Sequence, residues 1–121
     1  MKRYLPALLI LAALAHAPAS RAADPYPNRP VRILVGFPPG GGADGIARML
    51  ADHMSRTLKQ PITVENRPGA NTTIAPATVA AAPADGYTLL LAADSIFGAD
   101  KVMFAPTVKY DEASFTPINR I

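Results

Sequence analysis

The chain has 121 residues, with 12 Lys and Arg against 9 Asp and Glu, two histidines and no cysteine. The lack of cysteine excludes disulfides, thiolate metal sites and cysteine nucleophiles, and two histidines leave little for a histidine-rich metal site or a Ser-His-Asp triad. A chain of this length can build one small domain around a single core.

The first 22 residues are typical of a secretory signal peptide. Lys2 and Arg3 precede a short apolar run, which ends in small residues that resemble a cleavage site. The run is too short for a comfortable bilayer span, which disfavours a membrane anchor. We therefore expect a signal peptide over 1–22 and an exported chain over 23–121. Without the three basic residues of the first segment, the 9 remaining bases balance 9 acids, which gives no argument for a nucleic acid or an anionic membrane as partner.

The exported part begins with a proline-rich lead-in and a first strand. "VRILVGF", residues 31–37, is short, β-branched and apolar, which indicates a buried strand. After the loop "PPGGGAD", a helical pattern covers residues 45–58, with Asp44 as its expected N-cap. The apolar stripe expected to face the core consists of Ile46, Met49, Leu50, Met54 and Leu58.

Two more strands and two short helices follow. "QPITVEN", residues 60–66, reads as a strand, and "IAPATVAAA", residues 74–82, as a short helix with Pro76 in its first turn. "YTLLLAA", residues 87–93, is apolar on both faces, which suits a central parallel strand. A further short helix is expected near residues 99–104.

The order of these elements predicts an α/β fold with a mostly parallel sheet and helices on both faces. In open α/β sheets, ligands sit just outside the carboxyl ends of the strands. The loops "PPGGGAD", "RPGANTT" and "AADS" would all lie at that edge. A binding edge is therefore predicted, with the alternative that the glycines only turn the chain.

The first loop also contains the spacing of a dinucleotide-binding fingerprint. Gly40, Gly42 and Gly45 form GxGxxG between a strand and a helix, and Glu65 lies about 20 residues further on. However, two prolines separate the strand from the first glycine, and an aspartate between the later glycines opposes a pyrophosphate. Export removes the chain from the cytoplasmic nicotinamide pool, and Glu65 can pair with Arg67 instead of a ribose. A nucleotide-binding enzyme is thus kept only as an alternative.

A carboxylate fits the glycine loop better than a dinucleotide does. Successive backbone N–H groups form a concave donor site, and the start of the following helix adds a positive partial charge. No cationic side chain is needed for such a site. Asp44 would then have to turn away from the anion and cap the helix.

Several motifs resemble the solute-binding proteins of tripartite tricarboxylate transporters, also called Bug-type extracytoplasmic receptors. "FPPGGG", "VENRPGA", "DGYTLL" and "YDEASFTPI" carry the resemblance in this order, from Tyr26 to the end of the chain. The resemblance implies a periplasmic binding protein whose two α/β lobes close around a ligand, without catalytic residues, cofactor or metal. It implies a small carboxylate or amino acid as ligand, membrane permease subunits as partners, no nucleic acid, and a monomer.

The resemblance also places the ligand on three loops. The residues implied are Phe37, Pro38, Pro39, Gly40, Gly41, Gly42, Ala43 and Asp44, then Pro68, Gly69, Ala70, Asn71 and Thr72, and finally Ala93, Asp94 and Ser95. The family usually has threonine at Ala43, more glycine in the second loop, and a neutral residue at Asp94. It also continues into a second lobe, so residues 23–121 are expected to form a partial first lobe with the second lobe missing. A truncated remnant that binds no ligand is the other alternative.

Overall fold

The computed structural model describes residues 25–104 and 108–121. The predicted signal peptide, residues 1–22, lies outside these ranges. Among the helices within them, none has the length and apolar character needed to cross a membrane.

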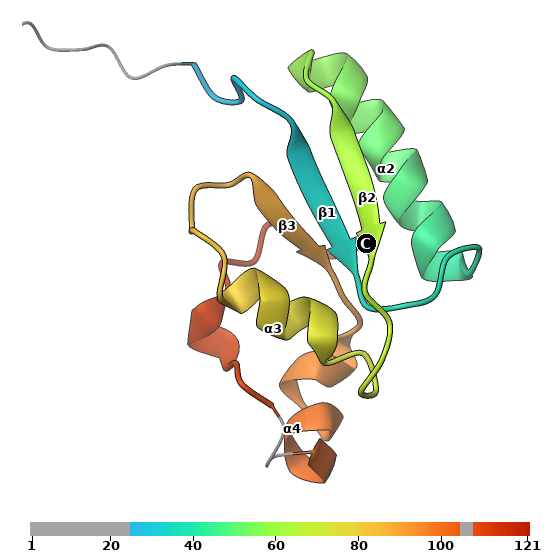
Figure 1. Cartoon of the computed structure of the whole chain (residues 1–121), viewed down its shortest axis with the longest axis vertical. Coiled ribbons are helices and arrows are strands. Elements are labelled where there is room, and N and C mark those ends of the chain that lie inside the picture. Colours follow the sequence, from blue (N-terminus) through green and yellow to red (C-terminus); the bar gives the residue numbers. More distant parts are fainter. Residues whose placement is uncertain (1–24, 105–107) are drawn as a thin grey trace, which may run out of the picture.

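Three parallel strands form the sheet, in the order β2-β1-β3 (Figure 1). The strands are β1 (Val31–Val35), β2 (Ile62–Asn66) and β3 (Thr88–Leu91), and the helices are α2 (Gly42–Leu58), α3 (Ile74–Ala80) and α4 (Ala99–Phe104). Short 3-10 helices η1 (Asp94–Phe97) and η2 (Glu112–Ser114) complete the described elements. The predicted parallel α/β arrangement is confirmed, as is the short helix at residues 99–104.

The prediction that the third strand is central is wrong, because β1 has that position among the described strands. Right-handed crossovers lead from β1 to β2 in one direction and from β2 past β1 to β3 in the other. This reversal places the two crossover helices on opposite faces of the sheet. It also surrounds β1 with strands on both sides, and only Arg32 of its residues is exposed. All four residues of β3 are half-buried.

Helix α2 covers one face through small residues. Ala47 and Ala51 are buried against Ile33 and Val35, and the larger side chains of Leu50 and Met54 pack around this cluster. Alanine lets the helix approach the strands closely. The helix therefore presents to the sheet a face that is centred on two alanines.

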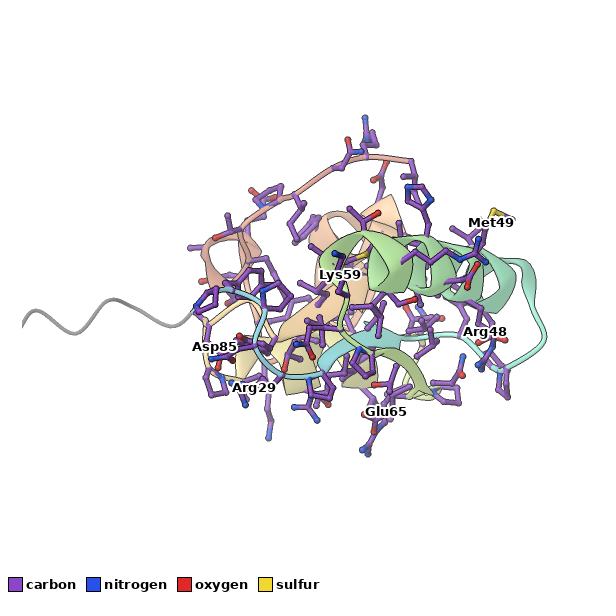
Figure 2. All side chains as sticks on the ribbon, turned by 90° about the horizontal axis from the view of Figure 1, so that it is seen from above. Arg29, Arg48, Met49, Lys59, Glu65 and Asp85 are labelled. Atoms are coloured by element: carbon purple, nitrogen blue, oxygen red, sulfur yellow. The ribbon has the colours of Figure 1, made fainter. Side chains whose placement is uncertain are left out.

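Two members of the predicted apolar stripe do not face the core. Met49 is 75% exposed and Ile46 is 48% exposed. Figure 2 shows Met49 on the side of α2 that faces away from the strands. The prediction is wrong here because the face that meets the sheet is centred on Ala47 and Ala51. At about 100° per residue, Ile46 lies about 100° around the helix from Ala47, and Met49 lies almost opposite both alanines.

Helix α3 contacts β1 and β3 on the other face (Figure 1). Leu34, which alternates with Ile33 and Val35 along β1, is fully buried. Ala75 and Pro76 are the buried residues of α3. Pro76 lies in the first turn of the helix, as predicted, where a missing N–H leaves no intrahelical bond unmade.

The lead-in is attached to the end of the sheet where the strands begin. The Tyr26 hydroxyl donates to the Gly86 carbonyl at 2.7 Å, and the Tyr87 hydroxyl donates to Asn28 Oδ1 at 2.8 Å. Arg29 pairs with Asp85 at 2.7 Å, and both are labelled at this end in Figure 2. These contacts hold the lead-in at the opposite edge from the loops that were predicted to bind.

Candidate functional site

The carboxyl ends of the three strands are level with one another. Val35 is paired in register with Asn66 of β2 and with Leu91 of β3. The loops that leave this edge are loop 1 (residues 36–41, to α2), loop 2 (residues 67–73, to α3) and loop 3 (residues 92–93, to η1). Figure 1 shows the three arrowheads pointing to the same edge, with the loops beyond them.

One predicted binding residue from each of the three loops lines the same shallow depression at this edge, which has no room for a water molecule. They are Phe37, Thr72 and Ala93. The rest of the lining comes from Gly36, Pro76, Leu90, Leu91, Ala92 and Ile96. Phe37 also packs against the core beneath α2, so this residue contributes to both places.

The other predicted residues are not among those that line this depression. Those that are exposed are Pro38, Pro39, Gly40, Gly41, Gly42, Pro68, Gly69, Ala70, Asn71 and Asp94. Ala43 is half-buried against the core, and Ser95 is half-buried at the start of η1. Asp44 is 4% exposed and lies beneath the surface of the loop.

Helix α2 begins three residues earlier than the sequence pattern indicated. Gly41 is the N-cap, with extended backbone at φ −82° and ψ 174°, and no side chain caps the helix. Asp44 is therefore a first-turn residue, and the prediction that it is the N-cap is wrong. Glycine is accepted at the N-cap position, which allows this early start. The backbone N–H groups of the first turn and the positive end of the helix dipole thus lie at the loop edge.

The Asp44 carboxylate is held by three different neighbours. Its Oδ2 accepts from the Gly40 N–H and from Arg48 Nε, each at 2.9 Å, and its Oδ1 accepts from Asn66 Nδ2 at 2.9 Å. The Asn66 amide also donates to the Phe37 carbonyl at 3.1 Å. These contacts join loop 1, the first turn of α2 and the end of β2.

These bonds keep Asp44 ionised. Its pKa lies well below the ordinary 3.8, chiefly because of the hydrogen bond from Arg48, with further contributions from Gly40 and Asn66. The same pairing raises the pKa of Arg48. Arg48 offsets the charge that would repel a bound anion, and the Gly40 N–H is already bonded to the protein's own carboxylate. Asp44 is directed into the protein, although not by capping the helix.

Loop 2 has an unusual backbone for its sequence. Gly69, Ala70, Asn71 and Thr72 have φ values of 122°, 44°, 51° and 66°. Positive φ is unfavourable for residues other than glycine and most so for a β-branched residue such as threonine. The turn is closed by Thr73, whose hydroxyl donates to the Ala70 carbonyl at 2.7 Å.

Loops 1 and 2 are in close contact at Gly36. A Cβ atom at Gly36 would lie 2.9 Å from the Thr72 carbonyl oxygen and 3.1 Å from Thr72 Cβ. A side chain there could fit only if the backbone of loop 2 moved. Gly36 therefore allows the two loops to share one depression.

Loop 3 leads to a charged but solvated residue. Asp94 pairs with Arg120 at 2.6 Å, and both side chains are more than four-fifths exposed. Exposed pairs of this kind contribute little and are screened by salt. Asp94 therefore has a partner and solvent to offset its charge near the depression.

The acidic residue of the dinucleotide fingerprint is also paired. The Glu65 carboxylate accepts from Arg67 Nε at 2.7 Å, which is one of the two alternatives that the sequence left open. Arg32 approaches the same carboxylate at 3.9 Å. Within residues 25–104 and 108–121, no group of three or more His, Asp or Glu side chains is arranged to hold a metal ion.

Sequence reasoning missed Gly36, Arg48 and Asn66 as residues that shape this site. Asn66 carried one usable signal, since it is a polar residue at the carboxyl end of a strand, where ligands gather in α/β sheets. Arg48 had a weaker signal, as the i+4 partner of Asp44 on a helix. Gly36 gave none, because its close contact is with a residue 36 positions later in the chain.

Comparisons with known proteins give one consistent result. Residues 46–121 match the family model described as "Tripartite tricarboxylate transporter family receptor". The chain is 42% identical to protein BugT of Bordetella pertussis over 110 residues, which are 91% of this chain and 34% of BugT. The chain thus spans about a third of the length of that curated relative.

Solved structures agree in both fold and sequence. MatC from Rhodopseudomonas palustris with bound malate is 40% identical, with a TM-score of 0.70 over 76% of this chain and 31% of MatC. Another R. palustris protein, solved with adipate, is 32% identical, with a TM-score of 0.62 over 74% of this chain and 29% of its own. The matched family consists of receptors and not of enzymes, which disfavours the nucleotide-binding alternative.

Proposed function

We propose a function from one premise: the chain belongs to the tripartite tricarboxylate transporter receptor family. It is the amino-terminal part of a periplasmic solute-binding receptor that captures a small carboxylate. Residues 1–22 are its export signal, and residues 23–121 are a partial first lobe. The second lobe, which closes over the ligand, is supplied by sequence beyond this stretch, and permease subunits receive the ligand.

The convergence of three loops on one depression carries this proposal. Phe37, Thr72 and Ala93 come from loops that follow three different strands, and they line the same depression. This is the edge at which α/β sheets bind ligands. Relatives with the same fold have been solved with malate and with adipate, which are both dicarboxylates.

The first turn of α2 suits one carboxylate group of such a ligand. The N–H groups of Gly42 and Ala43 belong to the turn whose donors have no intrahelical acceptor. A helix of 17 residues places its positive dipole end at the same point. Amides in a loop held in shape can bind a carboxylate directly or through bridging water, without a cationic side chain.

Titration calorimetry of the protein expressed from the full reading frame tests the proposal, with malate, adipate, citrate and glutamate as ligands. A second, longer form of the protein includes any downstream coding sequence that continues in the same reading frame. We expect at least one of these carboxylates to bind and NAD to give no heat. Binding of no carboxylate by either form would overturn the proposal in favour of a remnant, and binding of NAD would favour the enzyme.

A matched pair of glycine variants locates the site. Gly41→Phe adds a bulky group at the N-cap, where the backbone has an ordinary negative φ and the nearest atom, the Pro38 carbonyl oxygen, lies 3.6 Å from the added Cβ. We expect this variant to fold and to lose carboxylate binding. Gly45→Phe, one turn further along α2 and open to solvent, is the control and should bind normally.

A further inference from the structure

Asn66, at the end of β2, joins the two ends of loop 1. Its Nδ2 group donates to the Phe37 carbonyl at 3.1 Å and to Asp44 Oδ1 at 2.9 Å. Phe37 lies near the start of the loop, and Asp44 lies just beyond its end. An amide NH₂ has two hydrogens, so these two acceptors use its full donor capacity. Arg48 Nη2 donates to Asn66 Oδ1 at 3.3 Å and orients the amide.

The last part of the loop is held by the same cluster. The Gly40 N–H donates to Asp44 Oδ2, which also accepts from Arg48 Nε. Gly40 has a φ of 84°, a conformation that glycine adopts readily. The loop is thus attached near its start and near its end to one amide and one buried carboxylate, which are bonded to each other.

A second aspartate–arginine pair on the same helix shows that stabilising the helix does not by itself account for the burial of Asp44. Asp52 and Arg56 have the same i,i+4 spacing as Asp44 and Arg48. The Asp52 side chain is 62% exposed, whereas that of Asp44 is 5% exposed. A helix gains from such a pair at its surface, and burial is not required for that gain. The burial of Asp44 is explained by what it holds, which is loop 1.

We propose that Asn66 is a positioning residue of the carboxylate site, which keeps loop 1 in its binding shape by clamping Phe37 and Asp44 before any ligand arrives. This inference rests on the proposed function. A loop that is already ordered loses less conformational freedom when it binds, and its affinity is higher for that reason. Asp44 is likewise a positioning residue and does not contact the ligand.

The variant Asn66→Asp tests the clamp with almost no change in shape. It removes both donors and sets a second carboxylate beside Asp44, while the acceptor for Arg48 remains. Asn66→Ser removes the reach of the side chain without adding a charge, and it also serves if Asn66→Asp does not fold. Asp52→Asn is the matched control, because it neutralises an exposed carboxylate of the same helix.

Two readouts are measured on the full chain and its longer form. The first is the ¹H–¹⁵N resonance of the Gly40 amide without ligand, which reports its bond to Asp44. The second is the ratio of malate affinities, parent over variant, between pH 7 and pH 5. Taking the ratio cancels the effect of malate's own titration on both affinities. A variant that had only lost overall stability would give the same ratio at both pH values.

We expect both Asn66 variants to shift the Gly40 resonance and to bind malate about tenfold more weakly at pH 7, the effect of about 1.4 kcal/mol. For Asn66→Asp the ratio should fall towards one at pH 5, because two adjacent carboxyls then share a proton and form a hydrogen bond. For Asn66→Ser the ratio should stay constant, and Asp52→Asn should match the parent.

An unmoved Gly40 resonance, or equal affinities at pH 7, would overturn the clamp. If the parent protein bound neither malate nor adipate in either form, small carboxylates would be wrong as the ligand class of the proposed function. In that case the Gly40 resonance alone decides whether Asn66 positions the loop.

Discussion

Loop 1 and loop 2 leave neighbouring strands at the same edge, but they are held in shape by different means. Loop 1 contains Gly36, Gly40 and Gly41, of which only Gly40 has a positive φ, and side chains of α2 and β2 hold it from below. Loop 2 has positive φ at four consecutive residues, and only Gly69 among them is a glycine. One loop combines a permissive backbone with side-chain bonds, and the other keeps an unfavourable backbone in place by packing.

The difference suggests how the two loops respond to change. Each left-handed residue other than glycine costs about 1–2 kcal/mol, and asparagine tolerates this conformation better than alanine or threonine does. The turn of loop 2 persists because Thr73 closes it and Thr72 lies against Gly36. Loop 1 should therefore be sensitive to the loss of polar side chains, and loop 2 to changes in backbone freedom.

The largest effect is expected where the two loops touch. Gly36→Val places its Cβ 2.9 Å from the Thr72 carbonyl oxygen, so the backbone of loop 2 must move. We expect the free energy of unfolding to fall by about 3 kcal/mol, the upper range for overpacking, as measured by urea denaturation. Gly45→Ala, with open space around the new Cβ, should instead raise stability slightly, since alanine favours a helix interior. Equal effects of both substitutions would contradict a close contact between the loops.

The next largest effect is expected from Asp44, whose charge holds loop 1. The folded pKa of Asp44 is depressed, so its contribution to stability is fully present above the ordinary pKa of 3.8 and is lost as pH falls towards the lower folded value. Asp44→Asn should therefore have a lower Tm than the parent at pH 7, and the gap should narrow below pH 3.8. Thermal denaturation followed by circular dichroism between pH 7 and pH 2 measures the gap. A gap independent of pH would show that the charge is not what holds the loop, and Asp52→Asn should show no gap.

A smaller effect of opposite sign is expected in loop 2. Ala70 is exposed with a φ of 44°, so Ala70→Gly relieves backbone strain and removes few contacts. We expect a gain of about 0.5–1 kcal/mol in the free energy of unfolding, after allowance for the greater freedom of glycine in the unfolded chain. Ala77→Gly within α3 is the control and should lower stability by about 1 kcal/mol. A loss of stability at both positions would mean that loop 2 is not strained.

The smallest effect is expected beside loop 3. Asp94 and Arg120 form an exposed pair, so Asp94→Asn should change the free energy of unfolding by less than about 0.5 kcal/mol. Carboxylate affinity should rise less than about threefold, and the rise should vanish at about 1 M salt, where exposed charges are screened. Titrations at low and high salt measure this, and a large rise that salt does not reduce would place Asp94 in the site.

Local patterns predicted most of the fold and part of the site. The apolar β-branched runs are strands, the order of elements is that of a parallel sheet, and Pro76 lies in the first turn of α3. The three loops share one edge, as the alternation of strands and helices indicated. The start of α2, the exposure of Met49 and the central position of β1 were not predictable in this way, because each depends on how the helix and strands pack.

The sequence by itself determined the element order, the loops at the carboxyl edge, the glycines that allow loop 1 to turn, and the family to which the chain belongs. Only the tertiary structure decided the role of Asp44. This residue is not the expected helix cap but a buried side chain that holds loop 1. The partners responsible are Arg48 on the same helix and Asn66 on a strand that the chain reaches only after that helix ends. A carboxylate is stable in such a buried position only when donors from several segments meet it, and the fold alone brings those segments together.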